Sequence, residues 1–291
     1  MGSTSAAMPC HVRSISLPSQ SHLRIEIELN KLRTWEIFPL KAERICDGLS
    51  SLGELYNCVE DLLQSPVTQQ VLIRHQKEEE WLDEMLDEFL RLLDMCSTTR
   101  DIFLLMKEHV HDLQSSLRRR RDMENKIRTY MHFQKKVKKD VSKCLAVLKQ
   151  LNVKCASYPI LDQNHNLSVV VKVLGDVRTI TISIFQSLMS FLVEPRPKHG
   201  SRSLVSKFMQ KGKVACEGEL EDIDNVESVN VMLCNLCERN SSKDTEMERV
   251  KKAQKRLETL RVTVEGFEAG LECLFRHFIQ TRVSLLNILT H

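Results

Sequence analysis

Apolar residues recur along most of the chain at steps of three and four positions, which is the spacing of one face of an α-helix. Two long stretches keep this spacing without interruption. The first consists of Leu82, Met85, Phe89, Leu92, Cys96, Thr99, Phe103, Met106, Val110, Leu113 and Leu117. The second consists of Val250, Ala253, Leu257, Leu260, Val264, Phe267, Leu271, Leu274, Phe278, Thr281, Leu285 and Ile288. The pattern predicts two helices of about 45 residues each, roughly 65 Å long, that lie side by side.

Three shorter stretches repeat this spacing, at residues 45–63, 123–151 and 170–191. The third is rich in Val, Ile and Thr, a composition that favours strands. Its apolar positions nevertheless step by three or four rather than by two. We therefore predict a helix over residues 169–193 that is buried on a wide face.

Proline and glycine mark the expected breaks between helices. Neither occurs between Pro66 and Pro159, as long helices require. Ser65 and Pro66 are typical of an N-cap and the first position of a helix. Residues 194–218 contain two prolines and three glycines, which predict a loop, and a shorter acidic helix is expected at 219–238.

These patterns predict an all-α protein, an elongated antiparallel multi-helix bundle with coiled-coil-like long helices and a flexible N-terminal tail. We place the tail at residues 1–22 and a single bundle domain at residues 23–291. Leu86, Leu93 and Ile102 lie beside the first seam and widen its apolar stripe, which favours a core formed within one chain. A coiled-coil homodimer that uses one of the seams is the alternative.

Composition argues against the common catalytic scaffolds. Only 9 of the 291 residues are glycine, and the P-loop, Rossmann, GxSxG and HExxH motifs do not occur. We therefore expect a non-enzymatic protein without a cofactor or bound metal. Cys234 and Cys237 form a CxxC pair, but no second pair or nearby histidine completes a zinc site, so we interpret them as ordinary helical residues.

The ten cysteines are spread over long periodic segments and are expected to be reduced thiols. Cys96 and Cys144 lie on apolar stripes, where cysteine packs as a small hydrophobe. Residues 1–22 lack the apolar run of a signal peptide, and the longest uncharged run, 179–193, is too short to span a bilayer. We expect a cytoplasmic protein, with peripheral membrane attachment as the alternative and the nucleus less favoured.

The net charge is only +3, so attraction to an anionic partner requires a local patch. Residues 118–143 provide one, with eleven cations against three acids. Its main clusters are Arg118, Arg119, Arg120 and Arg121, and Lys135, Lys136, Lys138 and Lys139. We expect a solvated basic face that pairs with acids in 78–88 or 217–227. The alternatives are a basic helix face that binds anionic lipid headgroups, and a bipartite nuclear signal. Few aromatic residues lie among the lysines, which argues against single-stranded nucleic acid.

The N-terminal region contains a short phosphorylation motif, Arg13-Ser14-Ile15-Ser16-Leu17-Pro18. It fits the R-S-x-S-x-P arrangement that 14-3-3 proteins bind after phosphorylation of the second serine. A phosphate adds nearly two negative charges that an arginine cluster can hold. We therefore predict that phosphorylated Ser16 recruits a 14-3-3 protein; the alternative is a polar tail without this role.

Four sequence blocks carry a resemblance to a known family. They are HVRSISLPS at 11–19, GLSSLGELYNCVEDLLQSP at 48–66, LRLLDMCSTTRDIFLLMKEHV at 90–110 and GLECLFRHFIQTRVSLLNILTH at 270–291. With these blocks in this order the chain resembles the plant family known as domain of unknown function 241, the BYPASS-like proteins. Two positions depart from the pattern: Leu23 replaces a proline, and Asp87-Glu88-Phe89 replaces a Gly-Ser step. The resemblance implies a helical plant protein linked to root and shoot development, without an assigned activity.

Overall fold

The computed structural model describes residues 19–35, 41–75, 81–154, 165–193, 226–237 and 243–290. These ranges contain eight helices and no strand, which confirms the predicted all-α class. The helices are α1 (Ser19–Trp35), α2 (Ala42–Leu63), α3 (Pro66–His75), α4 (Trp81–Arg119), α5 (Met123–Lys154), α6 (His165–Val193), α7 (Val226–Cys237) and α8 (Lys243–Thr290).

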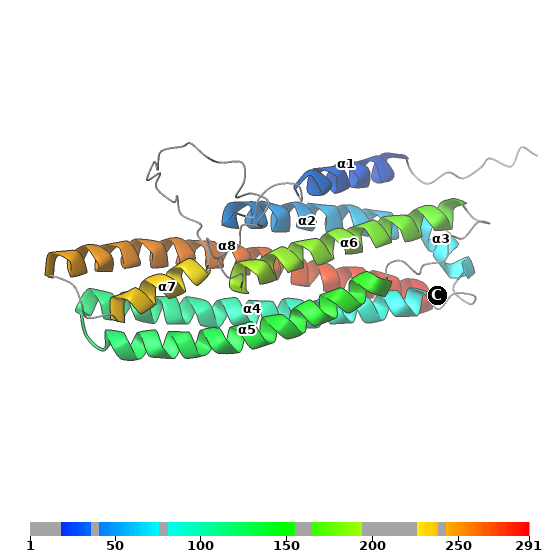
Figure 1. Ribbon diagram of the computed structural model, residues 1–291. Coiled ribbons are helices and arrows are strands. Elements are labelled where there is room, and N and C mark those ends of the chain that lie inside the picture. Colours follow the sequence, from blue (N-terminus) through cyan, green and yellow to red (C-terminus); the bar gives the residue numbers. More distant parts are fainter. Residues whose placement is uncertain are drawn as a thin grey trace, which may run out of the picture.

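The helices form one elongated bundle in which α4 and α8, the two longest, lie side by side as predicted (Figure 1). Their contacts show that they run in opposite directions. Cys96 Sγ donates to the main-chain oxygen of Leu271 at 3.4 Å, and further along Gln114 Nε2 donates to Glu258 at 2.9 Å. Residue numbers therefore rise along α4 while they fall along α8, as an antiparallel pair requires.

Helix α2 packs against the other side of α8, and this pair is parallel. A Cβ atom on Gly266 would lie 3.0 Å from Cys46 Sγ, near the start of α2. Near the end of α2, Ser284 Oγ donates to Glu60 Oε1 at 2.6 Å. Helix α8 is thus antiparallel to α4 but parallel to α2. Apolar spacing alone does not indicate these directions.

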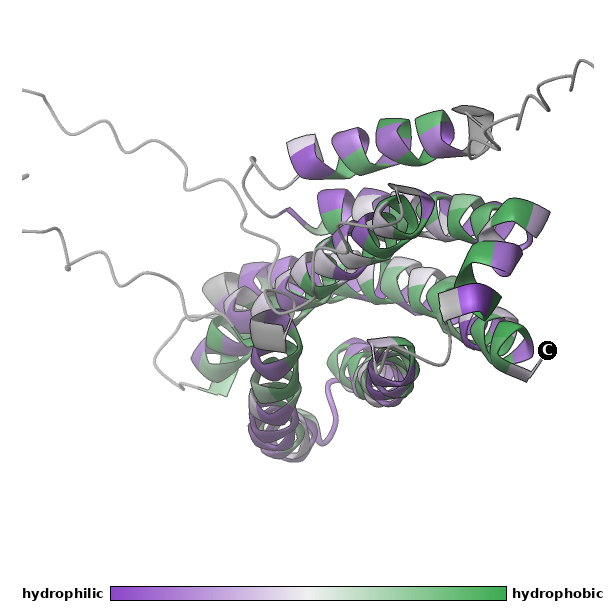
Figure 2. Cartoon of the chain, turned by 90° about the vertical axis from the view of Figure 1, so that its right-hand side faces the viewer, coloured by the Kyte–Doolittle hydropathy of each residue, from purple (hydrophilic) through white to green (hydrophobic). Residues whose placement is uncertain are grey.

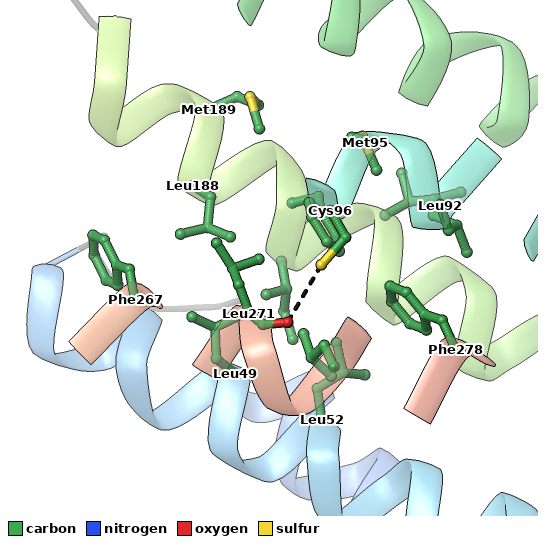
Figure 3. Packing of buried hydrophobic residues seen from close by; sticks show 14 of the residues in the cluster. Leu49, Leu52, Leu92, Met95, Cys96, Leu188, Met189, Phe267, Leu271 and Phe278 are labelled. Carbon is green, nitrogen blue, oxygen red and sulfur yellow. Dashed lines mark hydrogen bonds between the residues drawn. The ribbon is translucent and has the colours of Figure 1, made fainter. Parts of the chain in front are cut away.

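The predicted stripes form the core. Every residue of the α4 series is buried, and so is every residue of the α8 series except Val250, which is half-buried. Figure 3 shows α2, α4, α6 and α8 contributing to one apolar cluster around the Cys96–Leu271 hydrogen bond. Hydrophobic and hydrophilic residues alternate around the helices in Figure 2, as amphipathic helices require.

Several predicted boundaries differ from the observed ones. Pro66 begins a helix as predicted, but that helix is the short α3; the long α4 starts at Trp81. The hydroxyl of Ser65 makes no capping hydrogen bond, although its main-chain oxygen accepts the N–H of Gln69 at 3.0 Å. The predicted tail was placed at 1–22, whereas α1 already begins at Ser19. The predicted loop at 194–218 lies outside the described residues.

The helix predicted over 169–193 is confirmed as α6, and it is buried on a wide face. Beyond the stripe that begins at Val170, residues such as Val171, Leu174 and Phe185 are also buried. Cys96 and Cys144 are buried as expected, and burial raises the pKa of the Cys96 thiol to about 12.

Candidate functional site: the basic end of the bundle

The chain reverses direction between α4 and α5 at a turn made largely of arginine. Arg118 and Arg119 close α4, whereas Arg120 and Asp122 adopt left-handed backbone conformations with φ of 52° and 55°. Ser116 Oγ donates to the main-chain oxygen of Arg121 at 2.6 Å and fixes the turn. The expectation that residues 118–143 form one basic helix is therefore wrong, because the first cluster lies at a helix end and the turn that follows it.

The second predicted cluster lies on α5. Lys135, Lys136, Lys138 and Lys139 are all exposed, while the apolar stripe of α5 points into the core. Lys135 is about fourteen residues beyond the turn, a distance of roughly 20 Å along the helix. The two clusters thus occupy different elements, the first at the end of the bundle and the second near the middle of α5.

Helix α8 adds a third cluster that the sequence analysis missed. Its first turns carry Lys251, Lys252 and Lys255, all exposed. The antiparallel seam brings them toward the arginine turn, since Gln114 of α4 contacts Glu258 of α8. The hydrogen bonds from Arg261 and Gln114 lower the pKa of Glu258, and the charge of Arg118 makes a smaller contribution. The run from Lys251 to Arg256 is visible in the sequence, but only the fold places it beside Arg118.

We define the basic end as these three clusters together. It consists of Arg118, Arg119, Arg120, Arg121, Lys135, Lys136, Lys138, Lys139, Lys251, Lys252 and Lys255. In Figure 1 the α4–α5 turn and the start of α8 lie together at the left end of the bundle.

Four acids near the basic end are already engaged in ion pairs. Within the described ranges Lys126 pairs with Asp112 at 2.6 Å, Arg128 with Glu124 at 3.2 Å, Lys138 with Glu227 at 3.4 Å and Lys143 with Asp140 at 2.9 Å. The hydrogen bond from Lys126 lowers the pKa of Asp112, so that pair remains ionised at neutral pH. Glu227 belongs to one of the two acidic segments proposed as partners for the basic stretch. Glu88, from the other segment, instead pairs with Arg178 in the core.

The other ten members of the basic end make no ion pair with any described residue. Acids nevertheless lie close to some of them, because Glu258 interacts with the charge of Arg118 and because Asp122, Glu246 and Glu248 are exposed in the same segments. Arginine can hold a phosphate through two parallel N–H donors, and lysine adds a compact positive charge. This arrangement suits an extended anionic surface better than a single small anion, because the cations are spread over a turn and two helices.

Helix α7 lies between two of these clusters and borders two hollows. One, of about 300 Å³, lies between α5 and α7 and is lined by Gln134, Lys138 and Asn230 among others. The other, of about 330 Å³, lies between α7 and α8, and its lining includes Lys252. Asn230 Oδ1 is buried without a hydrogen-bond partner, and the amide of Gln134 is buried beside the hydroxyl of Tyr130, with which it interacts. A buried polar atom without a partner costs about 1–3 kcal/mol of stability, so Asn230 requires an explanation.

Comparison with known proteins identifies the family. Residues 48–288 match the family described as Protein BPS1, which is the BYPASS-like plant family that the sequence blocks resemble. The chain belongs to this family. No curated protein and no solved structure matches it significantly.

Membership in the BPS1 family indicates a protein related to plant development. The matched range of this BPS1-family chain includes the basic end and α7. The motif formed by Arg13, Ser14, Ser16 and Pro18 precedes the match, and it also lies outside the described residues.

The structure also shows where the CxxC pair of this BPS1-family chain lies. Cys234 and Cys237 are exposed on α7, and the described ranges contain no group of three or more potential metal ligands. No described helix combines the length and apolar character that a transmembrane segment requires.

Proposed function

We propose that this protein is a non-catalytic helical binding protein of plant development that attaches to anionic membrane surfaces through its basic end. The observation that carries the proposal is the set of ten exposed cations on the α4–α5 turn, α5 and α8 that have no ion-pair partner in the described part of the chain. The rest of the bundle then serves as a platform for protein partners, one of which is a 14-3-3 protein bound to phosphorylated Ser16.

The position of the cations supports a flat partner. The arginine turn lies at one end of the bundle, beside the start of α8 (Figure 1), and its four arginines are all exposed. Each Lys or Arg near an anionic membrane contributes about 1 kcal/mol of binding free energy. Several such contributions give measurable attachment without an inserted apolar segment, and they weaken as salt screens the charges.

Co-sedimentation of the purified protein with vesicles tests the proposal. Vesicles of phosphatidylcholine alone are compared with vesicles that also contain phosphatidylserine, at low and at moderate salt. The test variant replaces Arg118, Arg119, Arg120 and Arg121 with glutamine. The control variant makes the same change of net charge elsewhere, at Lys41, Arg74, Arg91 and Lys172, which are exposed and form no ion pair among the described residues.

We expect salt-sensitive binding to the anionic vesicles that falls at least tenfold in the test variant and changes less than threefold in the control variant. Equal binding to both types of vesicle, or equal losses in both variants, would contradict membrane attachment through the basic end. The basic end would then be a solvated face of a soluble protein-binding scaffold.

A further inference from the structure

The hollow between α5 and α7 contains two buried amide side chains at its lining. Gln134 is 3% exposed and Asn230 is 7% exposed, and they come from opposite sides of the hollow. Asn230 Oδ1 has no hydrogen-bond partner, and the Gln134 amide, which interacts with the buried hydroxyl of Tyr130, keeps further hydrogen-bonding capacity. Buried polar atoms in folded proteins are nearly always paired, so this hollow offers two acceptors and one donor to an incoming group.

An ion pair stands one helical turn from each amide. Lys138, four residues after Gln134, contacts Glu227 at 3.4 Å, and Glu227, three residues before Asn230, accepts from Asn230 Nδ2 at 3.1 Å. Lys138 is half exposed, so a carboxylate from solution can reach it and replace Glu227. That exchange releases Lys138 from Glu227, while Glu227 keeps the hydrogen bond from Asn230.

The exposed face of α7 extends this site toward α8. Val231 and Asn235 line both the α5–α7 hollow and the α7–α8 hollow. Val231 is 38% exposed, a large fraction for an apolar side chain. On the far side Lys252 lines the second hollow. An apolar ridge therefore lies between cations from two helices.

We propose that α7 and its two flanking hollows bind an acidic peptide segment of a partner protein. The main-chain N–H and C=O groups of the peptide pair with Gln134 and Asn230, which supply both acceptors and a donor. Its carboxylates contact Lys138 on one side and Lys252 on the other, and an apolar side chain packs on Val231. Both hollows are open to solvent, which suits an extended peptide better than a small acid that needs to be enclosed.

Fluorescence polarisation with the full-length protein tests this site. The probe is a fluorescein-labelled peptide of glutamate, leucine and serine, and a twin with glutamine in place of glutamate measures the contribution of charge. N-acetylglutamate, which carries the same carboxylates beside a secondary amide, serves as an unlabelled competitor. We expect the acidic probe to bind at least tenfold more tightly than its twin and N-acetylglutamate to compete only weakly.

Three variants locate the binding. Lys138→Gln is expected to weaken the acidic probe about tenfold, whereas Lys136→Gln, which makes the same charge change on α5 outside the hollow, changes it less than threefold. The double variant Gln134→Leu/Asn230→Leu is also expected to weaken the probe about tenfold. Its melting temperature should be equal to or above that of the wild type, because leucine removes an unpaired buried polar atom.

The results separate this site from membrane attachment. The variant with Arg118–Arg121 replaced by glutamine should keep its affinity for the acidic probe, since none of those arginines lines the hollow. Full binding by the double leucine variant, equal effects of Lys138→Gln and Lys136→Gln, or competition by N-acetylglutamate as strong as that by unlabelled peptide would overturn the peptide site.

Discussion

Glu88 of α4 and Arg178 of α6 form an ion pair inside the core, with side chains that are only 4% and 6% exposed. Arg178 also donates from its second terminal nitrogen to the main-chain oxygen of Leu151 at 2.7 Å, near the end of α5. One guanidinium group therefore connects three helices. Glu88 belongs to the Asp87-Glu88-Phe89 step at which the sequence departs from the family pattern.

Removal of the charge of one partner should destabilise the folded protein. We expect Glu88→Gln to lower the free energy of unfolding by about 3–5 kcal/mol, because it removes one charge of a buried ion pair. The double variant Glu88→Met/Arg178→Met should recover most of that loss, since a buried ion pair is often no more stable than well-packed apolar residues. Urea denaturation measures both values. A Glu88→Gln variant as stable as the wild type would show that the pair is not formed in solution.

Two glycines in helices should respond to alanine in opposite ways. A Cβ atom on Gly270 of α8 would lie 2.9 Å from Leu49 Cβ on α2, whereas a Cβ atom on Gly175 of α6 would meet nothing within 4 Å. We expect Gly270→Ala to destabilise the protein by about 1–3 kcal/mol through overpacking. Gly175→Ala should stabilise it by about 0.5–1 kcal/mol, because alanine suits a helix interior better. Thermal unfolding measures both shifts, and a Gly270→Ala variant as stable as the wild type would contradict the packing of α2 on α8.

Stability should fall as the pH drops below about 6.5. Burial lowers the pKa of His109, which lies against Phe133 with ring centroids 4.6 Å apart, and that of His277, which is stacked on Tyr56. The unfolded chain therefore takes up protons first as the pH falls, and the folded state loses stability between the unfolded and the lower folded pKa. Denaturation at pH 7.5 and pH 5.5 should show this loss, and His109→Gln/His277→Gln should reduce it. An unchanged slope in the double variant would assign the effect to other groups.

The N-terminal motif is tested without the rest of the bundle. A peptide of residues 10–22 with phosphoserine at Ser16 should bind a 14-3-3 protein in a calorimetric titration, because the phosphate supplies the charge that the arginine cluster of that protein holds. The unphosphorylated peptide and a peptide phosphorylated at Ser14 instead should bind at least tenfold more weakly. Absence of binding by the Ser16 phosphopeptide would remove this partner.

The helical class and the core residues could be predicted because burial follows directly from apolar spacing. The eleven apolar-stripe positions that run from Leu82 to Leu117 lie on one face of the helix, whichever helices cover that face. All eleven are buried. Helix ends were less predictable. The chain reverses after Arg119 without a glycine or proline to mark the turn. Arg120 and Asp122 instead adopt the left-handed conformation that glycine usually supplies.

The candidate site was predicted only in part. Charge clustering in the sequence indicates Arg118–Arg121 and the lysines of α5, but Lys251, Lys252 and Lys255 join them through contacts between α4 and α8, more than a hundred residues apart. Gln134 shows a different limit of prediction from the sequence. It occupies a stripe position on α5, and sequence alone does not reveal which group on a neighbouring helix it faces. Long-range pairs such as Glu88 and Arg178 are hidden for the same reason.

Hydrogen–deuterium exchange of the full-length protein with anionic vesicles tests the central claim most directly, because it reports which part of the surface the membrane covers. With vesicles that contain phosphatidylserine, we predict slower amide exchange at residues 116–124, where the chain turns between α4 and α5. Exchange in α3 and at the end of α8, at the other end of the bundle, should not change. Vesicles of phosphatidylcholine alone should protect neither region. Protection confined to α3 and the end of α8, or no protection at 116–124 while the protein is bound, would contradict attachment through the basic end.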